Sequence, residues 1–165
     1  MNRRLFLAAL PAALAAGCGF QLRRLGGMPF ASLFVDAPPD SAVAKRIRTA
    51  LAADKKTWIT ATAGEADAVL KLSQEERTKT ILSLSGAGRV TEYRLGLQFK
   101  YSVVARDESL LAAPESIELN RDLTYDDTQL LAKGAEELLL YRDMEDNAAL
   151  RIVRRLQALK PGNGS

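Results

Sequence analysis

The residue types that usually carry enzyme chemistry are scarce in this chain of 165 residues. It contains no histidine, which excludes Ser-His-Asp and Cys-His nucleophiles, histidine general bases and histidine-ligated zinc. Its one cysteine, Cys18, can form neither an intrachain disulfide nor a metal site of several thiolates. The formal net charge of +3 is too small to predict nucleic-acid binding driven by the charge of the whole chain, although a local basic patch stays open.

Paired carboxylates are the remaining candidates for proton transfer. Asp126-Asp127 and Glu136-Glu137 could in principle act as acid and base. Their place around the expected start of a long helix favours helix capping and a solvated first turn instead. Gly86 and Gly88 lack the following helix and the lysine that a phosphate-binding loop requires. We therefore expect a protein that is not an enzyme and that has no catalytic residue, no cofactor and no metal ion.

The lone cysteine instead indicates a lipid anchor. Arg3 and Arg4 precede an uncharged apolar run at residues 5–16, which is too short for an ordinary membrane span and is typical of an export signal. Ala15-Ala16-Gly17 leads directly into Cys18 and resembles the bacterial lipobox, in which a peptidase cuts before a cysteine whose thiol carries diacylglycerol. An incidental thiol beside an ordinary cleavage site is the alternative. Gly19 after the cysteine, where an aspartate would favour retention in the inner membrane, favours the outer membrane.

These signals divide the chain into four parts. We expect a cleaved signal peptide at residues 1–17, a lipidated N-terminal tether at 18–30, a single α+β domain at 31–160 and a disordered tail at 161–165. Removal of the signal peptide leaves 21 basic against 20 acidic residues, so the mature protein is close to neutral. Several acyl chains would hold such a protein firmly on the membrane, since one chain alone binds only marginally.

The domain itself shows strand periodicity and two helical segments. Strands are expected at 32–36, 58–62, 67–73, 80–85, 90–104 and 116–125, with an irregularity at Gln74-Glu75-Glu76-Arg77 and a hairpin tip at 85–88. In the strand at 90–104 the residues that share the apolar face are Tyr93, Leu95, Leu97, Phe99, Tyr101 and Val103. A first helix follows a cap at Asp40 or Ser41.

A long second helix begins after Asp126 and ends at Pro161-Gly162. Its apolar face is expected to consist of Leu131, Ala135, Leu138, Tyr141, Met144, Ala148, Ile152, Leu156 and Leu159. The strand, helix and strand at the start of the domain predict a right-handed crossover. Together the patterns predict an α+β fold: a two-layer sandwich with two amphipathic helices packed on one face of a mainly antiparallel sheet of about four strands.

Several segments, in order along the mature chain, resemble the LPS-assembly lipoprotein family LptE. The first is Cys18-Gly19-Phe20-Gln21-Leu22-Arg23, next to the lipidation site. Gly88 to Val103 is similar to the central hairpin strand of that family. Tyr125-Asp126-Asp127, followed by Leu131-Ala132-Lys133 and then 141–156, is similar to its long helix.

The resemblance implies a fold of two helices on a four-stranded sheet and a role at the outer membrane. Members of that family plug a large outer-membrane β-barrel LPS-assembly protein of the LptD type, help it to fold, and help to deliver lipopolysaccharide to the outer leaflet. By resemblance, this protein is expected to be lipid-anchored in the outer membrane through Cys18 and to face the periplasm. Its expected partners are that β-barrel and lipopolysaccharide, with no nucleic acid.

The resemblance also implies which cations bind lipopolysaccharide. Lys133 matches a basic position early in the long helix, and Arg89 lies a few positions from the family's basic residue near the hairpin tip. Arginine offers phosphate a planar fork and lysine offers it a point charge. Solvated surface charge is the alternative for both residues. For the whole protein the alternatives are a stand-alone amphiphile-binding periplasmic lipoprotein in phospholipid transport, and a periplasmic enzyme that uses the acidic pairs.

Overall fold

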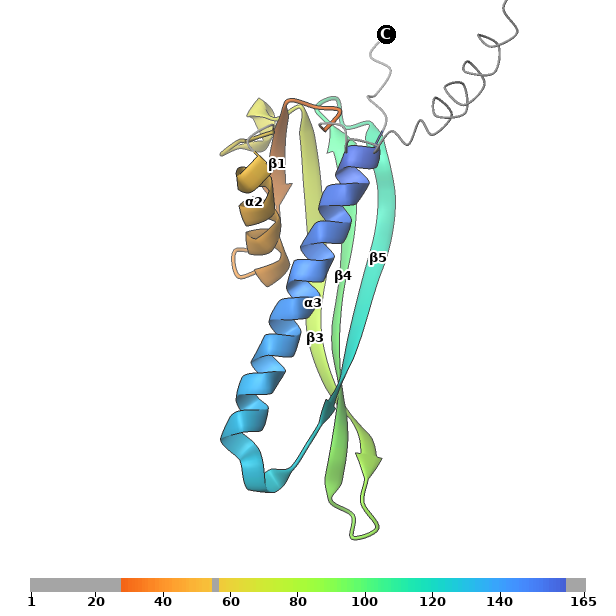
Figure 1. Cartoon of the computed structure of the whole chain (residues 1–165). Helices are drawn as coiled ribbons and strands as arrows, with labels where there is room; N and C mark the ends of the chain where they lie inside the picture. The colour runs from red at the N-terminus through yellow and green to blue at the C-terminus, as the bar shows by residue number, and fades with distance from the viewer. Residues whose placement is uncertain (1–27, 55–56, 160–165) are drawn as a thin grey trace, which may run out of the picture.

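The computed structural model describes residues 28–54 and 57–159, which form one β-sheet with two helices on the same face (Figure 1). The signal peptide, Cys18, most of the predicted tether and the tail at 161–165 lie outside the described residues. Of the tether, residues 28–30 are described, and Met28 and Phe30 pack partly buried against the core. The elements in chain order are β1 (Ser32–Asp36), α2 (Ala42–Asp54), β2 (Trp58–Ile59), the 3-10 turn η2 (Ala63–Glu65), β3 (Ala68–Leu84), β4 (Val90–Ala105), β5 (Leu110–Thr124), the 3-10 turn η3 (Asp127–Gln129) and α3 (Leu130–Ala158).

The sheet has five strands in the order β2-β1-β3-β4-β5, which corrects the expected count of about four. β3, β4 and β5 pair antiparallel as predicted, but β1 pairs parallel with β2 on one side and with β3 on the other. The parallel pair β1–β2 is connected through α2, as the strand, helix and strand pattern indicated. The second parallel pair is β1–β3, which forms because β3 lies against the edge of β1 opposite to β2. This pairing joins distant parts of the chain, and local periodicity does not predict it.

A β-bulge joins the two segments predicted at 67–73 and 80–85 into the single strand β3. Gln74 has a φ of 55°, and the pairing with β4 slips by one residue between Ser73 and Glu76. The slip turns Glu75 toward the start of α2, where its Oε1 accepts hydrogen bonds from the N–H groups of Ala42 (3.0 Å) and Val43 (3.3 Å). The expected irregularity is therefore confirmed, and it also provides a carboxylate cap for a helix 33 residues earlier.

The N-terminal cap of α2 was predicted at Asp40 or Ser41, and it is Ser41. Its Oγ accepts from the N–H of Ala44 at 3.0 Å and donates to Glu75 at 2.5 Å.

The core lies between the sheet and the helices, with large side chains of at most 1% exposure: Phe99, Leu33, Ile47, Leu51, Leu70, Leu95, Leu97, Leu123, Met144, Ile152 and Leu156. Of the predicted face of β4, the residues from Leu95 to Val103 are buried and Tyr93 is half-buried.

The predicted apolar face of α3 is correct for its second part and wrong for its first part. Tyr141, Met144, Ala148, Ile152 and Leu156 are buried. Leu131 and Leu138, in contrast, are 91% and 55% exposed. The cause is length, because α3 has 29 residues and spans about 43 Å, whereas the neighbouring α2 has 13 residues and spans about 20 Å. The start of α3 extends beyond the layer that would cover it (Figure 1).

The molecule has two ends, which we call the hairpin end and the crossover end. The hairpin end consists of the β3–β4 turn Ser85–Arg89 together with residues 125–133, at the bottom of Figure 1. The crossover end lies at the opposite end of the sheet and consists of residues 28–31, Trp58, the β4–β5 turn 106–109 and the last turns of α3.

Candidate functional site

The β3–β4 turn sets the position of Arg89. The N–H of Ser85 donates to the carbonyl of Arg89 at 2.7 Å, and the N–H of Gly88 donates to the carbonyl of Ser85 at 2.9 Å. Gly88 has a φ of +76°, in the left-handed region where a residue without a Cβ is favoured. Arg89 leaves this turn with its side chain 75% exposed, and its Nη1 lies 3.7 Å from Oδ2 of Asp127.

Lys133 lies in the first turn of α3, at the same end of the molecule. Its Nζ donates to Oε2 of Glu136 at 2.9 Å, and its side chain is 16% exposed. The N–H and hydroxyl of Thr128 both donate to Asp126, and these bonds are the main reason that the pKa of Asp126 lies below its usual value. The positive charge of Lys133 lowers that pKa further. Asp126 is thus a capping carboxylate, as the sequence indicated.

The structure therefore brings Arg89 and Lys133 to one end of the fold, each beside an acidic partner. Asp127 and Glu136 are 59% and 49% exposed. The Arg89–Asp127 pair is exposed on both sides, and such pairs contribute about 0–1 kcal/mol and exchange readily with water or other anions. In the Lys133–Glu136 pair only the carboxylate is exposed. The arrangement can accept a multivalent anion such as a phosphate, which offers each cation more acceptor oxygens than a single carboxylate does.

A third cation, Lys79, holds the hairpin against α3, a contact that no sequence motif marks. Its Nζ donates to Oε2 of Glu137 at 2.6 Å and lies 4.4 Å from the centre of the Tyr93 ring. The bond to Glu137 raises the pKa of Lys79 above its usual value. Tyr93 in turn contacts Tyr125 edge to face, with ring centres 5.0 Å apart. Glu137, which the sequence left as a candidate acid or base, is an ion-pair partner here.

Large aliphatic side chains stand exposed on the two elements that carry Lys79 and Lys133. They lie on the last part of β3 and on the first part of α3, and they are between 41% and 91% exposed: Ile81, Leu82, Leu84, Leu130, Leu131, Leu138 and Leu139. We call this set the aliphatic flank. Exposed apolar residues gathered in one region mark a surface that meets a protein, a lipid or another apolar partner.

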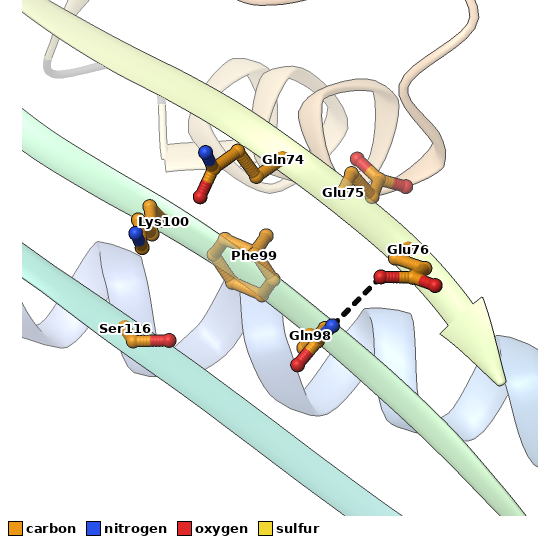
Figure 2. Close-up of a pocket in the computed structure, with 7 residues that line it drawn as sticks. All are labelled: Gln74, Glu75, Glu76, Gln98, Phe99, Lys100 and Ser116. Carbon is orange, nitrogen blue, oxygen red and sulfur yellow. Dashed lines mark hydrogen bonds between the residues drawn. The ribbon is translucent and has the colours of Figure 1, made fainter.

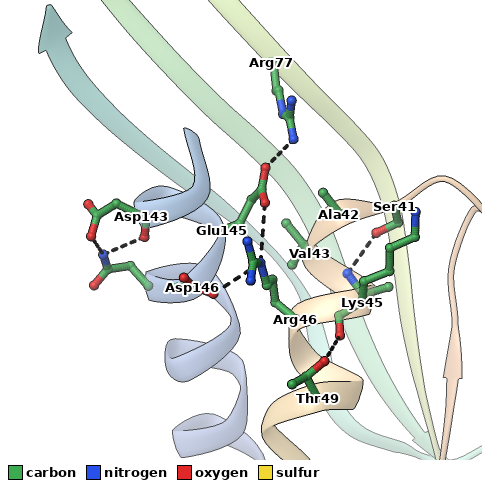
Figure 3. Close-up of polar contacts among 12 residues, drawn as sticks. Ser41, Ala42, Val43, Lys45, Arg46, Thr49, Arg77, Asp143, Glu145 and Asp146 are labelled. Atoms are coloured by element: carbon green, nitrogen blue, oxygen red, sulfur yellow. Dashed lines mark hydrogen bonds and ion pairs between the residues drawn. The ribbon is translucent and has the colours of Figure 1, made fainter. Parts of the chain in front are cut away.

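The second part of α3 is joined to α2 and β3 by a buried carboxylate, Glu145, which is 3% exposed (Figure 3). Its Oε1 accepts from Arg77 of β3, and its Oε2 lies 3.7 Å from Nε of Arg46 on α2. The guanidinium of Arg77 also lies 5.1 Å from the centre of the Tyr141 ring. This polar junction holds three elements together, and local sequence patterns do not reveal it because Arg77 and Glu145 are 68 residues apart.

The open face of the sheet carries a shallow polar depression at the bulge (Figure 2). Gln74, Glu76, Gln98, Lys100 and Ser116 line it, and Nε2 of Gln98 donates to Oε2 of Glu76 at 2.8 Å. This lining suits contact with a polar surface.

Across residues 28–54 and 57–159, no group of three or more acidic or cysteine side chains is placed to hold a metal ion. No helix in those same ranges is both long and apolar enough to cross a membrane.

Comparison with known proteins gives a consistent result. The sequence model of the family described as "LptE: Lipopolysaccharide-assembly" matches residues 30–156. The LPS-assembly lipoprotein LptE of Photorhabdus laumondii is 30% identical over 155 aligned positions, covering 91% of this chain and 82% of the relative. The protein of the same name from Pectobacterium atrosepticum is 30% identical over 174 aligned positions, covering 100% of this chain and 90% of the relative.

Solved structures agree with the sequence matches. The solution structure of an uncharacterized lipoprotein B from Nitrosomonas europaea has a TM-score of 0.74 at 31% identity, covering 85% of this chain and 91% of that one. The crystal structure of rare lipoprotein B from Shewanella oneidensis has a TM-score of 0.65 at 28% identity, covering 76% of this chain and 92% of that one. The fold observed here is thus shared with bacterial lipoproteins.

Proposed function

This chain belongs to the LPS-assembly lipoprotein family LptE, and from that premise we propose that it plugs an outer-membrane β-barrel translocon, assists its assembly and helps to deliver lipopolysaccharide to the outer leaflet. The observation that carries the proposal is the family match across 30–156, which spans nearly the whole described fold. The family is that of a non-enzymatic assembly lipoprotein, and the capping role of Asp126 agrees with such a function.

The open sheet face supports the role of a plug. From the bulge toward the hairpin its side chains are mainly charged or polar and bond to one another across strands, as Arg94 does with Asp122 at 2.9 Å and Gln98 with Glu76 at 2.8 Å. Nearer the crossover end the same face carries the apolar side chains of Phe34, Val69 and Val104. The interior of a large outer-membrane barrel is itself polar. We propose that this face meets the wall of the lumen of an LptD-like barrel and that binding relies on shape and hydrogen bonds.

A pull-down from mild detergent tests this partner. The mature protein is expected to co-purify with a large outer-membrane β-barrel, identified by mass spectrometry. Charge reversal of Lys100 together with Arg94 on the open face should reduce the recovered barrel several-fold, while reversal of Lys45 on the exposed side of α2 should leave it unchanged. Purification without any large barrel protein would contradict the proposal.

At the hairpin end we propose that Lys133 and Arg89 bind the phosphates of lipopolysaccharide. Charge-assisted hydrogen bonds contribute about 1.5–3 kcal/mol each, so the loss of one such bond weakens binding about tenfold or more. The aliphatic flank next to these cations supplies apolar surface of the kind that acyl chains prefer. Exchange of Asp127 and Glu136 for lipid phosphates is the step that this geometry supports.

Binding of purified lipopolysaccharide to the unacylated mature chain tests these two residues. Lys133→Glu and Arg89→Glu are each expected to weaken binding about tenfold. Lys45→Glu is the matched control, because Lys45 is exposed on α2 and its side chain takes no part in the site. Unchanged affinity in both variants would remove Lys133 and Arg89 from the site.

The lipid on Cys18 is proposed on the sequence of residues 15–18 alone. Mass spectrometry of the mature N-terminus is expected to find an acylated Cys18, and an unmodified N-terminus would contradict the anchor. A stand-alone carrier of amphiphiles, the alternative, needs an apolar cavity between the layers. The side chains that fill that space, such as Phe99, Leu97 and Met144, are at most 1% exposed and favour the plug.

A further inference from the structure

β5 is the outermost strand of the sheet, and among the described residues no strand pairs with its outer edge (Figure 1). Residues 115–124 of β5 pair with residues 92–101 of β4 without a break in register. The irregular part of β5, which contains Pro114, lies before that stretch. Residues 115–124 therefore form a regular strand with a free edge, which natural proteins usually shorten, cover or interrupt.

The register of β4 and β5 shows which backbone groups face the free edge. The N–H of Tyr125 donates to the carbonyl of Thr91, the residue that faces it, at 2.8 Å. Because hydrogen-bonded pairs alternate along an antiparallel ladder, the even-numbered residues of 116–122 turn their N–H and carbonyl groups away from β4. Accordingly, the carbonyl of Asn120 accepts instead from the side chain of Arg121, at 3.0 Å.

α3 runs beside this edge on the helix-covered face of the sheet. Arg121 of β5 donates to Asp143 of α3 at 2.7 Å, and Glu115 of β5 accepts from Arg155 of α3 at 2.7 Å. The two ion pairs are six residues apart on β5 and twelve residues apart on α3, which correspond to about 20 Å and about 18 Å. The strand edge and the helix therefore lie side by side over this length.

The depression between α3 and β5 is positively charged. Three arginines and two glutamates line it. Arg155 is paired with Glu115, whereas Arg151 and Arg154 have exposed side chains. The second glutamate, Glu118, belongs to the even-numbered residues of β5, whose side chains lie on the open face of the sheet. The two exposed arginines thus stand next to a row of free backbone groups.

We propose that the free edge of β5 pairs with an extended acidic segment of the barrel partner, whose alternate side chains are carboxylates that reach Arg151 and Arg154. The outward backbone groups of residues 116–122 bond to that segment, and the arginines select its charge. The inference rests on the proposed function, because it takes the barrel protein as the partner. A closed barrel wall has no free strand edge, so the segment is a loop of that protein which enters the lumen.

Charge argues against two other occupants of this edge. Residues 19–27 of this chain contain Arg23 and Arg24 and no acidic residue, so the arginines of the depression repel that segment. A second copy paired through β5 would set Arg151 and Arg154 of both copies against each other across the junction, on the same face of the joined sheet. An acidic segment meets neither obstacle.

Pull-down of the barrel tests the backbone pairing. Glu118→Pro removes an N–H that points away from β4, so we expect an unchanged circular dichroism spectrum and at least a fivefold loss of recovered barrel. Glu118→Gln removes the same charge but keeps the N–H, and it is expected to recover the barrel like the parent. Equal recovery with the two variants would overturn the pairing.

A synthetic peptide tests the edge without the barrel. The probe has eight residues in which glutamate and threonine alternate, and its control has the same composition with the four glutamates in one block. In NMR titrations of the unacylated chain from residue 18 with Cys18→Ser, the probe should shift the amides of the even-numbered residues of 116–122 most. It should bind at least fivefold more tightly than the block peptide, and equal affinities would contradict an extended acidic occupant.

Two double variants isolate the arginines in the same titration. Arg151→Gln with Arg154→Gln is expected to weaken binding of the alternating peptide at least fivefold. Arg142→Gln with Lys45→Gln removes the same charge from exposed positions outside the depression and is expected to bind like the parent. Equal affinities for the two double variants would overturn the role of the arginines.

The outcomes separate this inference from the proposed plug. Recovery of the barrel by the parent and by folded Glu118→Pro alike would overturn the pairing and leave the plug standing. A chain that binds the peptide at the edge but recovers no barrel would support the edge site and overturn the barrel as its occupant. Should Glu118→Pro fail to fold, the titration decides, because an absence of shifts along residues 116–122 overturns the site. A dimer of the parent that Glu118→Pro abolishes would assign the edge to a second copy and overturn the acidic segment.

Discussion

The two halves of α3 show opposite relations between sequence and burial. From Tyr141 onward the helix buries its apolar face against α2 and the sheet, and even Glu145 is buried. Before Tyr141, none of its side chains is buried, and four of its leucines are more than half exposed. We call residues 79–93 and 125–140 the hairpin half, in which no residue is buried, and the remainder of the described fold the crossover half.

This difference in burial indicates that the two halves of the fold have different roles. The crossover half contains the packed core and so supplies the apolar burial that drives folding. The hairpin half keeps its shape through Lys79, the Tyr93–Tyr125 pair and the backbone pairing of β3 with β4, while its leucines stay free to contact a partner. Glu145, Arg77 and Tyr141 lie where the two halves meet.

The largest expected effect contrasts one aliphatic truncation in each half. Ile152→Ala removes a side chain of 0% exposure and should lower the free energy of unfolding by about 2–5 kcal/mol. Leu138→Ala removes one of 55% exposure and should change it by at most about 0.5 kcal/mol. Urea unfolding followed by circular dichroism measures both. Similar losses in the two variants would show that the halves are equally packed.

Much of the crossover half could be predicted from the sequence, because its signals are local. The alternation from Leu95 to Val103 placed the dry face of β4 correctly, and the bulge at Gln74 was visible as an interruption. The apolar periodicity of α3 is equally regular in both halves of the helix. It identifies a face but not where the opposing layer ends, which is why Leu131 and Leu138 were wrongly expected to be buried.

Strand order and long-range polar contacts lie beyond such signals. Nothing in β1 itself indicates that it pairs parallel on both sides. The location of the candidate site could not be predicted from local patterns either. Arg89 and Lys133 were chosen by resemblance, and they lie at one end of the molecule because the β3–β4 turn and η3 come together there. Their binding of lipopolysaccharide stays a prediction.

The second-largest loss of stability is expected at Glu145, where the two halves meet. Glu145→Ala leaves Arg77 and Arg46 without their buried acceptor, and we expect a loss of about 1–3 kcal/mol, because both guanidinium groups keep partial access to water. Asp146→Ala is the matched control, since Asp146 also pairs with Arg46 but is 56% exposed, and it should cost at most about 0.5 kcal/mol. A control variant as unstable as Glu145→Ala would show that burial is not the cause.

A smaller loss is expected where the bulge caps α2. Glu75→Ala removes the acceptor for the N–H groups of Ala42 and Val43 and should cost about 1 kcal/mol, whereas Glu75→Gln keeps an acceptor oxygen and should cost less. Glu76→Ala, one residue away on the exposed face, is the control. Amide hydrogen exchange of α2 measures the effect locally. Protection of α2 that does not differ between Glu75→Ala and Glu76→Ala would exclude the carboxylate as the cap.

The smallest effect tests how the hairpin half keeps its shape. Lys79→Ala removes the bond to Glu137 and the contact with Tyr93, and solvent screening of its partly exposed charge limits the loss to at most about 1 kcal/mol.

The pKa of Lys79 is raised above its usual value of 10.5 by Glu137. A raised lysine pKa stabilises the fold fully below the unfolded value and loses that contribution as the pH rises through the folded one. The stability difference between the parent and Lys79→Ala should therefore be constant from pH 7 to about pH 9.5 and shrink once the pH exceeds the ordinary lysine pKa. Urea unfolding across this range measures it, with Lys100→Ala as a control on the open face of the sheet. A difference that persists at the alkaline end would mean that the methylene chain of Lys79 packing on Tyr93, and not its charge, joins the hairpin to α3.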